Sequence, residues 1–168
     1  MTVHDAIRAR RSIRTYKSDP VPEEHIRQLL ESAMLAPSAK NTRPWEFAVV
    51  RDRALREQIT QVSPYAKPVL AAPVAIVVSA RPDLGTTPVP FWQQDCGAAI
   101  QNLLLEAVEL GYGTCWCGLY PMEERSMAVK ALLGLTGDQV PLGVIALGVP
   151  DEAPNRRGFY DESRVKFF

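Results

Sequence analysis

The 168-residue chain has little of the chemistry that builds disulfide scaffolds or metal centres: it contains three cysteines and two histidines. An odd number of cysteines, clustered mid-chain, argues against a secreted disulfide framework, so a reducing cytoplasm is the expected compartment. Cys115 and Cys117 are one residue too close for a Cys-x-x-Cys pair, and only Cys96, His4 and His25 could join them. No metal site is therefore predicted.

Long hydrophobic runs and an excess of one charge are also absent. The apolar stretches 68–80 and 110–122 are shorter than the roughly 20 residues of a spanning helix, and the N-terminus has no signal-peptide core. We expect no membrane span. The 19 basic residues are balanced by 19 acidic ones, which argues against a nucleic-acid-binding protein. The length and the 46% hydrophobic content predict one folded domain, residues 1–168.

Several common motifs are missing. Gly111, Gly113 and Gly118 follow a predicted helix instead of joining a strand to a helix, so they do not form a dinucleotide-binding fingerprint. A phosphate-binding GxxxxGK[ST] run is lacking too. Neither histidine lies in the context of a catalytic triad, and His25 is predicted to be solvated on a helix surface.

Hydrophobic periodicity predicts alternating helices and strands of unequal length. Helices are expected at about 2–11, 22–34, 53–62, 91–110 and 122–133, and strands at about 46–51, 74–78, 114–120 and 140–147. Four strands mixed with five helices indicate an α/β or α+β sandwich. Strict βαβ alternation fails, because two helices precede the first strand. The loop at 81–90 holds three prolines and a glycine.

A basic segment follows the first predicted helix. Residues 10–14 read Arg-Arg-Ser-Ile-Arg, and Arg156 and Arg157 form a second basic cluster near the C-terminus. Arginine grips phosphate with two parallel hydrogen bonds, so these clusters are candidates for one shared phosphate if the two ends of the chain meet. The alternative is a solvated basic turn.

Two further segments are rich in turn-forming and small residues. Residues 36–45, Ala-Pro-Ser-Ala-Lys-Asn-Thr-Arg-Pro-Trp, join a helix to a strand, and residues 111–119 place glycines around Cys115, Trp116 and Cys117. Glycine permits a backbone to approach a flat ligand closely. The alternatives are a helix stop for the first segment and a helix cap leading into a core strand for the second.

Together, the three segments resemble the FMN-dependent nitroreductase family across essentially the whole chain. The resemblance implies an α+β fold with a mixed sheet flanked by helices, in an intertwined homodimer with FMN at the subunit interface. The C-terminal tail, about residues 150–168, would wrap onto the partner and bury Phe167 and Phe168. NAD(P)H would supply a hydride to the flavin, and a nitroaromatic or quinone would then be reduced at the same site in a ping-pong cycle.

The resemblance also implies which residues contact the cofactor. In the basic segment, Arg10 and Ser12 match residues that contact the FMN phosphate, and Arg14 matches a cation near the flavin pyrimidine edge. Arg11 belongs to the same candidate cofactor-binding segment. Arg156 or Arg157 would supply a phosphate contact from the tail.

Two other segments complete the implied site. Pro37, Ser38 and Asn41 match the loop that reaches the FMN of the partner subunit. Cys117 and Gly118 match the backbone beside flavin N5 and O4. The cysteine thiols are expected to be packing groups, and no side chain is assigned as a catalytic acid or base.

The sequence departs from the family pattern at two places. Arg43 stands where glutamine is usual, and the regions 60–73 and 81–90 have little of the helical material that covers the flavin in longer members. Three alternatives stay open: the same fold with dehalogenating or flavin-degrading chemistry, a flavin-binding storage or sensor protein, and a nucleic-acid-binding module that takes up no FMN.

Overall fold

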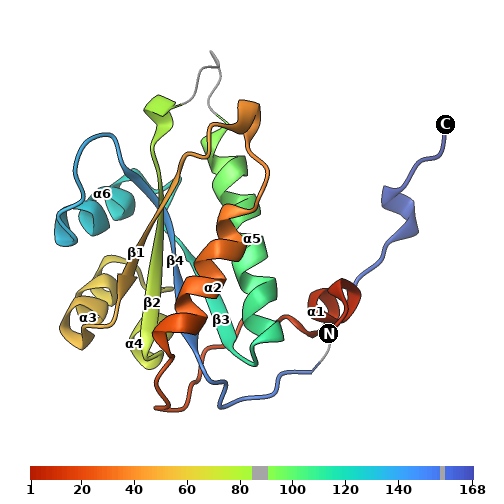
Figure 1. Cartoon of the computed structure of the whole chain (residues 1–168), viewed down its shortest axis with the longest axis horizontal. Helices are drawn as coiled ribbons and strands as arrows, with labels where there is room; N and C mark the ends of the chain where they lie inside the picture. Colours follow the sequence, from red (N-terminus) through yellow and green to blue (C-terminus); the bar gives the residue numbers. More distant parts are fainter. Residues whose placement is uncertain (85–90, 156–157) are drawn as a thin grey trace.

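The fold is built around a four-stranded sheet with helices on both faces (Figure 1). The computed structural model describes residues 1–84, 91–155 and 158–168. The strands run in the order β1-β2-β4-β3 and comprise β1 (Trp45–Val50), β2 (Val74–Ala80), β3 (Gly113–Gly118) and β4 (Val140–Gly148). One face carries α2 (Glu23–Met34) and α5 (Trp92–Glu109), and the other carries α3 (Arg53–Val62), α4 (Lys67–Ala71) and α6 (Glu123–Leu132). The predicted α+β class is confirmed.

The strand pairing is antiparallel between β1 and β2, between β2 and β4, and between β3 and β4. Among the described residues, parallel pairing is confined to one isolated bridge, between Ser12 and Thr114. The parallel component of the expected mixed sheet is therefore a single contact of the N-terminal segment with β3. Because β3 lies at the end of the strand order, this edge receives no further strand from the described chain.

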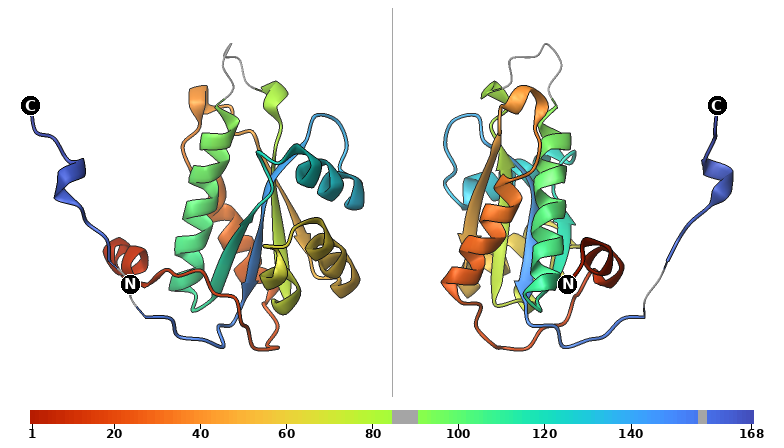
Figure 2. Two further views of the ribbon diagram at one scale, coloured as in Figure 1. Left: turned by 180° about the vertical axis from the view of Figure 1, so that it is seen from behind. Right: turned by 45° about the vertical axis from the view of Figure 1, so that its right-hand side comes forward.

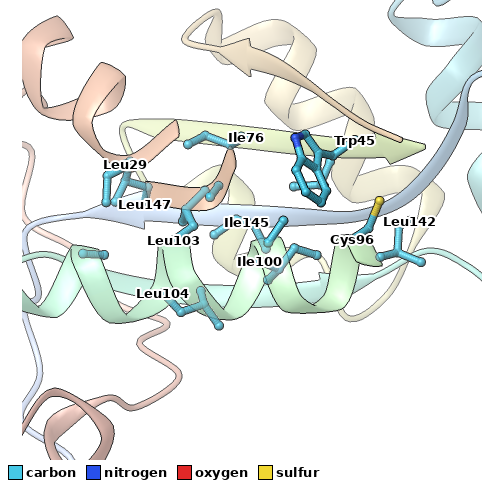
Figure 3. Packing of buried hydrophobic residues seen from close by; sticks show 14 of the residues in the cluster. Leu29, Trp45, Ile76, Cys96, Ile100, Leu103, Leu104, Leu142, Ile145 and Leu147 are labelled. Carbon is cyan, nitrogen blue, oxygen red and sulfur yellow. The ribbon is translucent and has the colours of Figure 1, made fainter. Parts of the chain in front are cut away.

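Two apolar layers result from the alternation of side chains along the strands. Ile76 and Ile145 face α2 and α5, where they pack with Leu29, Ile100 and Leu103 (Figure 3). All seven residues of β2 are buried, as its continuous apolar sequence predicts for a central strand covered on both faces. These layers fix the position of β3 relative to the helices.

The second layer, on the face of α3 and α4, contains the side chains of Cys115 and Cys117 beside Val77 and Val144. Their placement agrees with the expectation that the thiols are packing groups.

The chain ends lie on the same side of the molecule. α1 (Val3–Ala9) begins with a capping box between Thr2 and Asp5, and it ends two residues before the predicted limit. The last described segment contains a short 3₁₀ helix, η3 (Glu162–Arg164), and runs past α1 away from the sheet (Figure 2). Phe167 and Phe168 are not buried by the described chain, since their exposed fractions are 90% and 114%.

Four short elements were not predicted: α4, η1 (Ala39–Asn41), η2 (Pro82–Leu84) and η3. In α4, the buried Arg56 of α3 substitutes for a C-terminal cap, because its Nη1 donates to the carbonyl groups of Val69 and Leu70 at 3.3 and 3.2 Å and to that of Ala72. Among the described helices, none is long and apolar enough to cross a membrane.

Candidate functional site

The free edge of β3 presents backbone groups toward the N-terminal segment. The Ile13 N–H donates to the Thr114 carbonyl at 2.9 Å, so Thr114 points away from β4. Because backbone groups alternate along an antiparallel strand, Trp116 and Gly118 present their N–H and C=O groups on this same edge. Cys117, one position out of phase, pairs toward β4 instead. Of the two residues predicted to contact the flavin here, Gly118 therefore has the outward-facing amide.

A pocket of about 380 Å³ opens at this edge. It is lined by backbone and side chains of β3 and the turn that follows, together with one residue from each of three other segments: Arg14, Tyr65, Cys115, Trp116, Cys117, Gly118, Leu119, Tyr120, Pro121, Met122 and Arg125. A Cβ atom at Gly118 would meet nothing within 4 Å, so this glycine leaves open space at the pocket. The structure thus brings the predicted Arg14, Cys117 and Gly118 together.

Arg14 is held in place through its backbone. Its N–H donates to a carboxylate oxygen of Glu152, and the same oxygen accepts the Thr15 N–H at 3.1 Å. Its guanidinium donates to the Ser12 carbonyl at 3.3 Å and is exposed at the pocket. The tail segment carrying Glu152 therefore fixes the segment that carries the predicted flavin-side cation.

The rest of the basic segment lies where α1 ends. The Arg10 N–H donates to the Ala6 carbonyl, and the Arg11 guanidinium donates to the carbonyl groups of Arg8, Arg10 and Asn155, the last at 3.3 Å. The contact with Asn155 places the start of the C-terminal tail beside Arg11, and the shared phosphate stays a prediction. Arg156 and Arg157 themselves lie outside the described residues.

The predicted interface loop lies at a different part of the molecule. Pro37, Ser38 and Asn41 precede β1, which is the sheet edge opposite β3, and none of them is among the described residues lining the pocket. Three interstrand spacings of about 4.8 Å separate the two edges. One chain therefore does not bring this loop to its own pocket.

This loop has an unusual backbone. Lys40, Asn41 and Arg43 have φ angles of 50°, 56° and 49°, in the left-handed region that non-glycine residues rarely adopt. The Ala39 N–H donates to the buried Asp95 at 2.9 Å, and the Arg43 N–H donates to Ser38 Oγ at 2.9 Å. Arg43, the departure from the family pattern, also donates from Nε to Asn41 Oδ1 at 2.9 Å.

The two thiols at the pocket are buried and differ in acidity: the hydrogen bond with Cys117 lowers the pKa of the Cys115 thiol to about 7. The neighbouring Cys115 thiol and burial both raise the pKa of Cys117, and its Sγ donates to the Cys115 carbonyl at 3.9 Å. Burial raises the pKa of Cys96 to about 12. Burial also raises the pKa of Tyr16, whose hydroxyl donates to the Ile13 carbonyl and so secures the backbone just before Arg14.

Sequence reasoning missed three residues at or near these segments. Tyr65 and Arg125 line the pocket, and Asp95 holds the loop at Ala39. Only Asp95 carried a signal, since an acidic residue in the first turn of α5 suits the positive end of the helix dipole. The prediction of a solvated His25 is wrong: the ring is half-buried, with Nδ1 2.7 Å from the Tyr112 hydroxyl, because α2 packs beside the end of α5.

The protein has an α+β fold with a pocket at the edge of β3. Comparisons with known proteins identify the family to which it belongs. The sequence profile of the Nitroreductase family matches residues 7–67 and 63–149. The chain belongs to this family, whose members are flavin-dependent. It is 46% identical over 165 residues to a protein of Methanothermobacter thermautotrophicus with the provisional name NADH dehydrogenase/NAD(P)H nitroreductase, covering 98% of this chain and 86% of that protein.

Solved structures agree with this assignment. A protein of Parabacteroides distasonis with the same provisional name superposes with a TM-score of 0.93 at 34% identity, covering 98% of this chain and 96% of that one. A structure provisionally named as a nitroreductase in complex with FMN, from Desulfovibrio desulfuricans, gives a TM-score of 0.88 at 30% identity, covering 100% and 98% of the two chains.

The hydrogen-bond donors and the cation at the pocket are of the kind that would bind a flavin ring. A flavin ring is planar and offers carbonyl oxygens and ring nitrogens along one edge. The outward N–H groups of Trp116 and Gly118 suit such acceptors, and the Arg14 guanidinium suits negative charge on the ring. The open space at Gly118 permits close approach of a flat group to the backbone.

Proposed function

We propose that this protein is an FMN-dependent oxidoreductase that passes reducing equivalents from NAD(P)H to nitroaromatic or quinone-type acceptors. The observation that carries the proposal is the convergence of Arg14, Cys117 and Gly118 on one pocket beside an unpaired strand edge. Family membership supports a flavin, and the FMN-complexed relative supports FMN in particular.

In this proposal, Arg10 and Ser12 bind the cofactor phosphate, with Arg156 or Arg157 as a further contact. The Gly118 amide and the Arg14 guanidinium hold the polar edge of the ring. FMN, when bound, supplies the hydride chemistry. Arg14 would stabilise negative charge on a reduced ring, and its hydrogen bonds to Glu152 and Ser12 orient its backbone and side chain for this role.

We also propose that the working form is a homodimer. The loop with Pro37, Ser38 and Asn41 does not reach the pocket of its own chain, so a second copy would supply it. Exposed apolar side chains on α1, at the end of α2 and in the tail suit such an association, among them Ile7, Leu35, Phe159, Phe167 and Phe168.

The test is an anaerobic titration. The protein is loaded with FMN, excess FMN is removed, and NADH or NADPH is added while the visible flavin spectrum is recorded. Bleaching that is reversed by a quinone or a nitroaromatic supports the proposal and identifies the preferred reductant. A retained flavin that neither reductant bleaches, or a folded protein that retains no flavin, contradicts it.

A further inference from the structure

One end of the pocket carries an exposed aromatic side chain that the assignments above leave unused. Tyr65, in the turn before α4, is 74% exposed, and the Arg125 guanidinium lies over its ring at 5.7 Å from the centroid. Both residues line the pocket that contains Arg14 and Gly118. A tyrosine kept in solvent beneath a guanidinium contributes little to the core, and the ring face that the guanidinium does not cover is available to a ligand, as is the cation itself.

The backbone on both sides of this pair is anchored. The Arg125 N–H donates to the Met122 carbonyl at 3.0 Å, and the next residue, Ser126, is buried and donates from Oγ to the Pro141 carbonyl at 2.7 Å. On the other side, Ala66 is fully buried and its N–H donates to the Ser63 carbonyl at 3.0 Å. Both side chains therefore project from fixed positions.

The pocket is cationic. Arg14 and Arg125 are its charged lining residues, and the described lining contains no aspartate or glutamate. No ion pair between described residues engages either guanidinium. The apolar side chains of Leu119 and Met122 line the same pocket, so a ligand there meets apolar contacts beside two cations that attract an anion.

We propose that Tyr65 and Arg125 form an acceptor-binding wall that selects aromatic acceptors bearing a carboxylate. The acceptor ring lies against Tyr65, and its carboxylate accepts two parallel hydrogen bonds from Arg125. The inference rests on the proposed function, since it places the flavin at the Arg14 and Gly118 end. A neutral acceptor of the same shape gains the ring contact alone.

The experiment compares 4-nitrobenzoate with 4-nitrobenzyl alcohol on the FMN-loaded protein. Binding of each to the oxidised protein is measured from the perturbation of the flavin spectrum, without turnover, and kcat and KM are then measured with a fixed reductant. The variants are Arg125→Gln, Arg125→Lys and Tyr65→Ala. Arg51→Gln is the matched control, because Arg51 is an exposed arginine outside the pocket lining.

We expect Arg125→Gln to lower the benzoate-to-alcohol ratio of binding constants by about five- to tenfold, with the change in KM rather than kcat. Arg125→Lys restores part of the ratio, Tyr65→Ala weakens both acceptors, and Arg51→Gln leaves the ratio unchanged. An equal effect of Arg125→Gln on both acceptors, or an effect confined to the KM of the reductant or to FMN affinity, overturns the inference. A wild-type protein that retains or reduces no flavin instead refutes the proposed function.

Discussion

The side chain of Ile13 fills the space above Gly113: a Cβ atom at Gly113 would lie 2.7 Å from Ile13 Cγ1 and 2.8 Å from Ile13 Cβ. This contact lets the N-terminal segment lie directly on β3, with the Ile13 N–H on the Thr114 carbonyl. The same segment carries Ser12 and Arg14 on either side of Ile13. Because Gly113 has no side chain, the N-terminal segment lies close to β3. This fixes the position of the proposed cofactor contacts, Ser12 and Arg14, relative to the strand.

Replacement of Gly113 by alanine should therefore displace the segment. We expect Gly113→Ala to lower the free energy of unfolding by about 1–3 kcal/mol through overpacking and to weaken FMN binding. Urea unfolding and an FMN titration measure the two effects. Gly97→Ala is the matched control, because a Cβ there meets its nearest neighbour, Trp116, at 4.0 Å and alanine favours the helix. Equal behaviour of the two variants would contradict this account.

The carboxylate of Asp95 should control the conformation of the loop at residues 39–43. Asp95→Ala leaves the Ala39 N–H without its acceptor, and we expect a loss of about 1–3 kcal/mol in the free energy of unfolding. Asp95→Asn keeps an acceptor oxygen and should lose less. If the loop completes the cofactor site of a second copy, FMN affinity should fall in the same order. Unfolding and FMN titrations of the three proteins give the comparison.

Part of this architecture could be predicted from the sequence, and the physical reason differs between elements. α5 and β2 carry unmistakable patterns, because a long helix repeats its apolar stripe and a central strand is apolar throughout. α4 has five residues, too few for a periodic signal, and its carbonyl groups are satisfied by Arg56, whose burial depends on tertiary packing.

The same distinction applies to the candidate site: some of its residues could be predicted from the sequence and others could not. Arg14 and Gly118 were found from a motif, but Tyr65 and Arg125 come from segments 60 residues apart whose proximity only the fold reveals. The left-handed backbone conformation at Lys40 could not be predicted from the sequence either, because no glycine stands at this position. The expected burial of Phe167 and Phe168 on a partner stays a prediction.

Charge reversal at the basic segment should test the phosphate assignment. We expect Arg10→Glu combined with Arg14→Glu to weaken FMN binding at least about 100-fold, because two attractive interactions become repulsive toward an anionic ligand. The double variant Arg51→Glu with Arg53→Glu changes the net charge equally at exposed positions outside the pocket lining. The assignment fails if both double variants bind FMN as the wild type does.

The terminal aromatic residues should contribute to self-association. Phe167→Ser combined with Phe168→Ser removes two fully exposed rings, so it should leave the free energy of unfolding of the isolated chain almost unchanged. Burial of two aromatic rings on a partner would contribute several kcal/mol, so we expect the dimer dissociation constant to rise by at least about tenfold. Sedimentation velocity across a concentration series measures it. Met127→Ser, at an exposed methionine of α6, is the control that should leave association intact.

The stability of the N-terminal segment should depend on pH through Tyr16. Burial raises the pKa of its phenol above the ordinary value of 10.0, and the neutral hydroxyl donates to the Ile13 carbonyl. The unfolded chain therefore loses this proton first as the pH rises. The stabilising contribution is complete below pH 10 and declines above it, by up to about 1.4 kcal/mol per pH unit.

Comparison with Tyr16→Phe isolates this contribution, because the phenylalanine ring keeps the packing and lacks the ionisable group. At pH 8 we expect the variant to be less stable by about 1 kcal/mol, owing to the lost hydrogen bond. Between pH 10 and 11 the difference should shrink and then change sign, since only the wild type must keep a buried phenol protonated. Urea unfolding of both proteins at each pH gives the difference directly, and a difference that stays constant over this range would show that Tyr16 ionises as freely in the folded chain as in the unfolded one.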